Sequence, residues 1–356
     1  MKDKRKILHI THTLPDIRVE KMMLGGKDLG FDVEIAVERF NGFWFKDLEH
    51  TRVHIFPSSA MDQFGFRKTS VTAIQDIIKK VDPDIIHAHD IYIAHFVSQA
   101  TDRRFVYDDH EFWSKNVGLK KPQGSIFRKL KRSIGLAIRR RTVPTWEKEI
   151  LQNNVVITVT DQIANHHRNY SRDVFVIENF PHSKEISDIP EQKRERDLGV
   201  YIGKDLTMEG SPYRDASEFL KFVQDHGEIK MMVVGDNNIS SNNQIISTGF
   251  IPHTQILKTI SNASFGFLPW KPHPDHAFFC PNKIYLYAHA GLHSILPKTF
   301  VNHNLLSFAY FETYDDFLTI MQNPPTFTPK EIMQHAREEL VFERRYDELK
   351  QAYNIL

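Results

Sequence analysis

Three histidines lie near the ends of two short segments in the first half of the chain. His87 and His89 are in residues 83–90 (PDIIHAHD), and His110 is in residues 106–112 (VYDDHEF). Imidazole groups in such places can move protons, hydrogen-bond a ligand or bind a metal ion. We expect His87 and His89 to point to opposite faces of their strand, where they cannot bind one ion together. We therefore predict no metal site.

The common nucleotide-binding signatures are absent from the sequence. No GxGxxG pattern follows the first apolar run, and no GxxxxGK[ST] pattern occurs anywhere. In dinucleotide-binding and P-loop enzymes these patterns wrap main-chain N–H groups around phosphates. Simple dehydrogenases and P-loop enzymes are therefore disfavoured.

Composition narrows the class of protein. The 356 residues suffice for two domains. Lys and Arg (46) nearly balance Asp and Glu (45), and a net charge of +1 lacks the basic field of a nucleic-acid-binding protein. Cys280 is the single cysteine, which excludes intrachain disulfides. No apolar run approaches the roughly 18 residues of a membrane helix. We expect a cytoplasmic protein with no nucleic-acid partner.

Short β-branched runs alternate with segments of helical period, as parallel strands with crossover helices require. We predict strands at residues 6–10, 33–37, 53–56, 85–88, 105–107, 155–159 and 174–177, and, after a polar stretch, at 198–202, 229–234, 264–268, 294–296 and 305–309. Residues from about 331 to 356 predict a terminal helix. Two open α/β domains in series put the carboxyl ends of their sheets face to face, so the cleft between them is the expected ligand site.

Several segments, taken in order, carry a resemblance to a known family. They are residues 14–19 (LPDIRV), 83–90, 106–112, 156–161 (VITVTD), 176–181 (VIENFP), 200–204 (VYIGK), 233–236 (VVGD), 249–252 (GFIP), and 281–283 (PNK) leading to 287–291. The ordered set resembles the family-four glycosyltransferases, in the branch with a D-x-R-V first loop. It spans nearly the whole chain.

The resemblance implies an α/β fold of the GT-B type, with two Rossmann-like domains facing each other across a cleft. It implies an N-terminal acceptor-side domain at 1–180, a nucleotide-sugar-binding domain at 181–335, and a helix at 336–356 that packs back on the first domain. The implied activity is that of a hexosyltransferase of polysaccharide biosynthesis. It moves a sugar from a nucleotide-sugar donor to a glycan or lipid-linked acceptor, with retention and without a metal or other cofactor.

The resemblance also assigns residues. His110 matches the histidine that touches the donor sugar and helps to stabilise oxocarbenium-like charge; the alternative is an ordinary polar residue at a strand end. The donor side is expected to comprise Gly203, Lys204, Phe250, Ile251, Asn282 and Lys283. A cation beside a glycine turn and a helix amino terminus suits a diphosphate, and Asn282 is expected to cap its helix. Asp16, Arg18 and Asp90 are expected on the acceptor side. The alternative for Asp16 is that it serves only as the cap of the following helix.

Three positions depart from the family pattern. Where the family has a lysine, this sequence has Glu209. Where the family has a pair of glutamates, this sequence has Phe278 and Leu286. Each missing hydrogen bond to a charged group costs roughly 1.5 to 3 kcal/mol, or about ten- to a hundredfold in donor affinity. A weak or inactive relative that serves as a binding or scaffold subunit is therefore the main alternative. A sugar-nucleotide epimerase is a second one.

Residues 120–141 hold nine Lys or Arg and no acid, with Phe127, Leu130, Ile134 and Ile138 at helical spacing. This pattern predicts a basic amphipathic helix that docks on an anionic membrane, so that the enzyme is peripheral on the inner face of the cell membrane. The alternative places its apolar face in the core. The expected membrane-facing cations are Arg128, Lys129, Lys131, Arg132, Arg139, Arg140 and Arg141.

Overall fold

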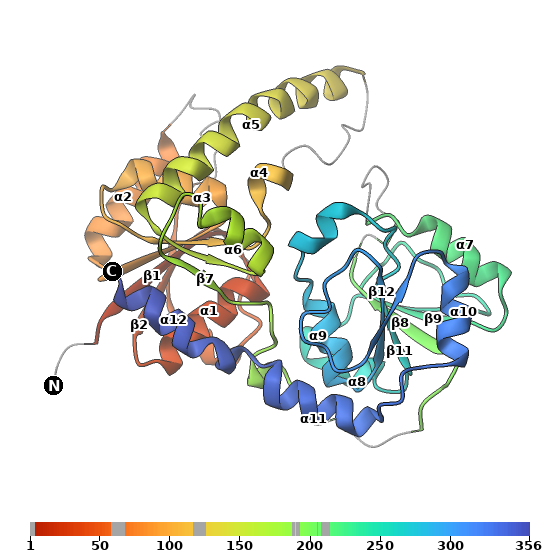
Figure 1. Ribbon diagram of the computed structural model, residues 1–356. Helices are drawn as coiled ribbons and strands as arrows, with labels where there is room; N and C mark the ends of the chain where they lie inside the picture. The colour runs from red at the N-terminus through yellow and green to blue at the C-terminus, as the bar shows by residue number, and fades with distance from the viewer. Residues whose placement is uncertain are drawn as a thin grey trace. The chain divides into compact units, whose positions relative to one another are not determined.

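The computed structural model describes the chain except for residues 1–3, 58–67, 117–125, 187–188, 190–192, 205 and 208–213. It describes no side chain from residue 116 to residue 132, both included. The chain forms two compact units (Figure 1). The first comprises the described residues up to Asn179 together with Arg345–Leu356, and the second is Phe180–Arg344.

A parallel sheet of seven strands, in the order β3-β2-β1-β4-β5-β6-β7, forms the centre of the first unit. Its strands are β1 (Lys6–Leu14), β2 (Asp32–Phe40), β3 (Arg52–Ile55), β4 (Ile85–His89), β5 (Val106–Asp109), β6 (Val155–Thr158) and β7 (Val174–Val176). All seven lie on the runs predicted from the sequence. Parallel strands buried on both faces are nearly continuous apolar runs, which is why they are easy to locate.

Helices cover both faces of this sheet (Figure 1). They are α1 (Ile17–Asp28), α2 (Thr69–Val81), α3 (Ile91–Ala100), α4 (Trp113–Asn116), α5 (Ile126–Asn153), α6 (Asp161–His167) and α12 (Tyr346–Asn354). The predicted apolar face of α2 is buried through Val71, Ile74, Ile78 and Val81, and Asp82 ends the helix in a left-handed conformation. On the opposite face, α12 contacts β6, β7 and α1.

The second unit has a parallel sheet of six strands, in the order β10-β9-β8-β11-β12-β13. Its strands are β8 (Leu198–Ile202), β9 (Lys230–Val234), β10 (Ile245–Gly249), β11 (Phe265–Phe267), β12 (His293–Pro297) and β13 (Phe308–Phe311). Its helices are α7 (Ser217–Asp225), α8 (Ile256–Ile260), α9 (Asn282–His289), α10 (Asp315–Gln322) and α11 (Pro329–Glu339). One core lies under α7 and α10, and the other lies under α8 and α9.

Two sequence-based expectations need correction. Strand β10 was not expected, because its sequence, IISTG, is polar at its end and is only half-buried. The expected single terminal helix is two helices, α11 and α12, with a 3₁₀ turn at Phe342–Arg345 between them. Leu340 and Phe342 are fully buried in this turn region, so the apolar pattern continues where the helix does not.

Each sheet changes its direction of strand addition once, between β1 and β4 in the first unit and between β8 and β11 in the second. At such a switch point the loops leave neighbouring strands in opposite directions, and ligands of open α/β sheets bind there, beyond the carboxyl ends of the strands. The residues after these strand ends are therefore the candidates for a functional site.

Candidate functional site

Two acidic residues cap helices at the carboxyl edge of the first sheet. Asp16 Oδ1 accepts the N–H groups of Arg18 and Val19 at the start of α1, at 2.9 and 3.1 Å. Asp90 Oδ1 likewise accepts the N–H groups of Tyr92 and Ile93 at the start of α3. Both carboxylates therefore have a structural function, and the alternative that Asp16 serves as a cap is confirmed. Their acceptor-side assignment stays a prediction.

His110 directly follows β5, and its Nδ1 lies 3.7 Å from Asp108 Oδ2. Burial by itself would lower the pKa of His110, but the Asp108 carboxylate raises it to about 9. His110 is therefore an imidazolium at neutral pH. A protonated ring can donate a hydrogen bond to a ligand oxygen, and the expected stabilisation of oxocarbenium-like charge stays a prediction.

Asp108 is the centre of a buried network. Its Oδ1 accepts Arg18 Nη2 at 2.8 Å, and its Oδ2 accepts Arg18 Nε at 3.2 Å and pairs with His89 Nδ1 at 3.0 Å. Burial opposes ionisation of this carboxyl, but the adjacent Arg18 guanidinium and the two histidines hold its pKa well below the usual range. The network thus keeps Asp108 ionised, and this negative charge favours the protonated form of His110.

The placement of Arg18 differs from the sequence-based expectation. Only 3% of the residue is exposed, and its Nη1 donates to the carbonyl oxygens of Ile177 and Glu178 at 2.7 and 3.2 Å. Its Nε and Nη2 donate to Asp108, so most of the guanidinium donors are used within the unit. Arg18 therefore positions Asp108 instead of bordering an acceptor site.

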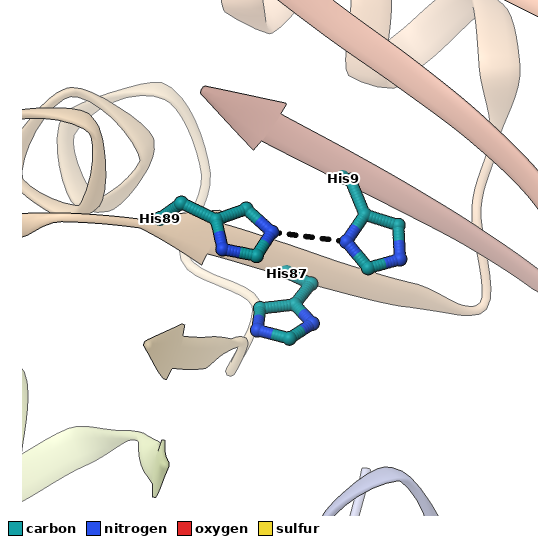
Figure 2. A group of neighbouring side chains, drawn as sticks. All are labelled: His9, His87 and His89. Atoms are coloured by element: carbon teal, nitrogen blue, oxygen red, sulfur yellow. Dashed lines mark hydrogen bonds between the residues drawn. The ribbon is translucent and has the colours of Figure 1, made fainter. Parts of the chain in front are cut away.

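The expectation that His87 and His89 point to opposite faces of β4 is wrong. Residues two apart on a strand share a face. Their rings stack with centroids 4.3 Å apart, and His9 lies beside them from the neighbouring strand β1 (Figure 2). Among the described residues this is the one group of His, Cys, Asp or Glu side chains whose spacing suits a metal ion.

In the second unit, Gly203 directly follows β8 with φ +142°, a conformation that favours glycine. A Cβ atom here would lie 2.9 Å from Lys283 Nζ, so the glycine also leaves room for the ammonium. The Tyr287 hydroxyl bridges the neighbouring strands β8 and β11, because it accepts Ile202 N–H at 3.2 Å and donates to the Phe267 carbonyl at 3.0 Å.

Lys283 is the second residue of α9, and its Nζ lies 3.8 Å from the ring centroid of Tyr201 and 5.4 Å from that of Trp270. Burial lowers the pKa of Lys283, the Tyr201 hydroxyl opposes this shift, and Arg214 adds to it. In the described part of the chain, Lys283 has no carboxylate partner. The Arg214 guanidinium lies over Trp270 and Phe279, at 5.7 and 5.3 Å. Two cations and a helix amino terminus therefore converge here, which suits a diphosphate.

Asn282 does not cap α9 as expected. The N-cap position is Pro281, and the first helical residue is Asn282, whose side chain makes no capping hydrogen bond. Its Oδ1 is buried and, within the described residues, has no hydrogen-bond partner. The Asn282 side chain is thus an unused acceptor beside Lys283.

The other predicted donor-side residues lie in loops around this edge. Lys204 is exposed directly after Gly203, in a loop whose next described residues are Leu206 and Thr207. Glu209 lies outside the described residues. Phe250 follows β10, is 63% exposed, and donates its N–H to Asn237 Oδ1 at 2.9 Å. An exposed ring in this place can stack on a planar base.

Ile251 and Leu286 face the core of the second unit. Ile251 is half-buried against the cluster under α8 and α9, and Leu286 is 4% exposed within it. Leu286 stands where the family pattern has a glutamate, so the structure supplies an apolar contact there in place of a charged acceptor.

Sequence reasoning gave no role to the side chains of Tyr201 and Trp270, the two aromatic faces around Lys283, or to that of Asp108, the partner of His110. Tyr201 lies within a predicted strand, and Asp108 and Trp270 follow predicted strands, so their places near a sheet edge were predictable. What the sequence does not carry is the pairing, because Arg18 and Asp108 are 90 residues apart.

The predicted basic helix is part of α5, which extends beyond the sheet it covers (Figure 1). Ile134 and Ile138 are 55% and 39% exposed, so at these positions the alternative of an apolar face in the core is wrong. Arg140 and Arg141 are exposed, and Arg139 lies over the Tyr92 ring at 5.5 Å. The side chains of Arg128, Lys129, Lys131 and Arg132 lie outside the description. Of the helices described, none is both long and apolar enough to cross a membrane.

The two parallel-sheet, Rossmann-like units define an α/β fold of the GT-B class. Residues 19–180 match the family model described as Glycosyltransferase Family 4. The search of curated proteins found no match.

Solved structures of similar fold include glycosyltransferases. Sucrose-phosphate synthase from Thermosynechococcus elongatus is 13% identical with a TM-score of 0.70, over 99% of both chains. The lipopolysaccharide outer core galactosyltransferase WaaB is 13% identical with a TM-score of 0.65, over 99% of this chain and 100% of that one. Anabaena HepE, solved with UDP and glucose, is 13% identical with a TM-score of 0.63 over the same shares. At such identities the likeness shows the fold alone.

The buried ion pair yields a stability prediction. Arg18→Met leaves the Asp108 carboxylate buried without its cation, so we expect the free energy of unfolding to fall by about 3–5 kcal/mol in urea titrations. The matched control is Arg104→Met, which breaks an exposed pair with Asp173 at 2.6 Å; it should cost less than about 1 kcal/mol. Equal losses in the two variants would contradict the central position of Asp108.

Proposed function

We propose that the protein is a glycosyltransferase that takes a sugar from a nucleotide-sugar donor and transfers it to a glycan or lipid-linked acceptor, with retention of configuration. The GT-B fold and the family match over residues 19–180 support glycosyl transfer. One observation carries the donor assignment. Lys283 is a buried cation at a helix amino terminus, with no carboxylate partner among the described residues, at the switch point of the second sheet.

Leaving-group stabilisation follows from these cations. Transfer of the sugar leaves a nucleoside diphosphate, whose negative charge grows as the bond to the sugar breaks. Lys283, Arg214 and the N–H groups at the start of α9 are placed to stabilise that charge, which is the function that a divalent cation serves in other transferases. We therefore propose that the transfer step needs no metal ion or other cofactor.

Other residues suit the base, the phosphates and the sugar of the donor. The exposed Phe250 ring offers a stacking surface for the base, and the main chain beside Gly203 allows close approach of the phosphates. We assign the His110 imidazolium to a hydroxyl of the donor sugar, where its ring N–H acts as a charged hydrogen-bond donor.

The exposed stripe of α5 supports a membrane-side acceptor. Ile134 and Ile138 can insert at the headgroup level while the neighbouring arginines contact anionic lipids, each contributing about 1 kcal/mol. We propose that α5 holds the enzyme at an anionic membrane surface, where a lipid-linked acceptor is found.

Nucleoside diphosphate binding tests the donor site. We expect Lys283→Met to weaken binding of UDP or GDP by about ten- to a hundredfold in calorimetry, because a charged hydrogen bond is lost. The melting temperature should stay level or rise, since the variant removes a buried charge without a carboxylate partner. Lys298→Met, which removes an exposed lysine of the same unit, is the control and should bind as wild type does. Unchanged binding in Lys283→Met would reject the donor site.

Turnover tests the reaction. With a panel of nucleotide-sugars and lipid acceptors, we expect release of nucleoside diphosphate for at least one donor, with activity falling above about pH 9 as His110 loses its proton. His110→Ala should lower turnover by about a hundredfold when assayed at a temperature at which the variant is fully folded. Diphosphate binding without any turnover would favour the binding-subunit alternative, and a product with an inverted sugar centre but no transfer would identify an epimerase.

Vesicle binding tests the proposed membrane surface. We expect the triple variant Ile134→Ser, Arg140→Gln, Arg141→Gln to lose co-sedimentation with anionic vesicles at low salt, while wild type remains bound. The control Arg168→Gln, Arg172→Gln removes two exposed arginines of the same unit from other positions. Equal sedimentation of wild type and the triple variant would contradict the docking role of α5.

A further inference from the structure

Three imidazoles lie together in the core of the first unit. His9 on β1 and His87 on β4 are direct partners in the parallel ladder, and His89 follows on the same face of β4. The exposed fraction of each residue is 1% or less. The opposite sides of these two strands carry aliphatic residues that form the main core under α2, α3 and α5. A polar cluster has therefore been placed where apolar side chains would pack at no cost in desolvation.

The outer nitrogens of two of these rings are held by other side chains. His89 Nδ1 lies 3.0 Å from Asp108 Oδ2, and His87 Nδ1 lies 2.9 Å from the Tyr353 hydroxyl on α12. A histidine that donates its Nδ1–H to a carboxylate or hydroxyl presents the Nε2 lone pair on the other side of the ring. In metal sites, a hydrogen bond from the other ring nitrogen to a carboxylate or hydroxyl orients the metal-binding histidine in this way.

The inner nitrogens lack sufficient partners. His9 Nδ1 faces His89 Nε2 at 3.0 Å (Figure 2). His9 Nε2 and His87 Nε2 are buried and, among the described residues, make no hydrogen bond. Leaving a buried polar atom unpaired costs about 1–3 kcal/mol, so two in one cluster call for an explanation.

We propose that His9, His87 and His89 bind one first-row transition-metal ion, of the class that takes imidazole nitrogen, with Zn²⁺ as the probe. One ligand nitrogen from each ring lies within 4.8 Å of the other two. Nitrogens around a tetrahedral Zn²⁺ at about 2.0–2.1 Å lie roughly 3.3 Å apart, a spacing inside the 4.8 Å spread of the three ligand nitrogens.

The site is structural and does not rest on the proposed transfer reaction. The ion would join β1 to β4 at the switch point of the first sheet, and through His87 and Tyr353 it would connect this sheet to α12. Three imidazoles leave one coordination position for a small ligand such as water, as in other three-histidine zinc sites. The Asp108 carboxylate, next to His89, partly offsets the charge of the ion.

Metal content of the full-length chain decides the proposal. After removal of any affinity tag, we expect elemental analysis to find about one transition-metal ion per chain. Chelation should lower the melting temperature, and added Zn²⁺ should restore it. Co²⁺ in its place should give the visible absorption of a tetrahedral site. Metal well below one ion per chain, with no thermal response to Zn²⁺, would overturn the proposal and leave a cluster of neutral, hydrogen-bonded histidines.

Variants locate the ion. His87→Gln should abolish stoichiometric Zn²⁺ binding, whereas His95→Gln, which changes a histidine of the same unit that stacks on Trp146, should retain it. Tyr353→Phe keeps the shape of the side chain and removes only the hydroxyl, and it should weaken Zn²⁺ binding by about tenfold or more. If His87→Gln does not fold, anomalous diffraction from zinc-soaked wild-type crystals still shows whether the ion lies between the three histidines. A peak elsewhere, or none, contradicts the site.

Discussion

The buried ammonium of Lys283 is the feature on which the functional account depends. A cation removed from water without a carboxylate partner is costly, and among the described residues Lys283 has two aromatic faces beside it and the like charge of Arg214 nearby, but no carboxylate. Gly203 leaves the space that the ammonium occupies, and the Tyr287 hydroxyl connects the two strands beside it. The second unit is thus built around a charge that an anionic ligand would complete.

The first unit is organised around the opposite charge. The Asp108 carboxylate is ionised at the end of β5 because Arg18 reaches it from α1, and its field keeps His110 protonated. The same carboxylate orients His89 and, through it, the three-histidine cluster. One side chain therefore connects a candidate sugar-binding group to a candidate metal site, and both depend on a helix–sheet contact that is fully buried.

Much of the fold could be predicted because buried parallel strands are apolar on both faces, whereas the edge strand β10, with its Ser, Thr and Gly, has no such pattern. Gly203 and Lys283 were assigned to the donor side from the resemblance, through the VYIGK and PNK segments. The roles of Arg18 and Asn282 could not be predicted, since the first depends on Asp108, 90 residues away, and the second on which residue begins α9. The His87–His89 geometry was open to prediction from strand periodicity alone, and there the inference itself was at fault.

The most direct test of the donor site is the ionisation of Lys283, followed by NMR on protein labelled with ¹³C-lysine and assigned through the resonance missing in Lys283→Met. The account predicts a pKa below that of the exposed lysines in the free protein, and a pKa that rises when UDP or GDP is added, because the diphosphate stabilises the ammonium. A Lys283 resonance that titrates with the exposed lysines and does not respond to either nucleotide would contradict the claim that this cation is held in place for a diphosphate.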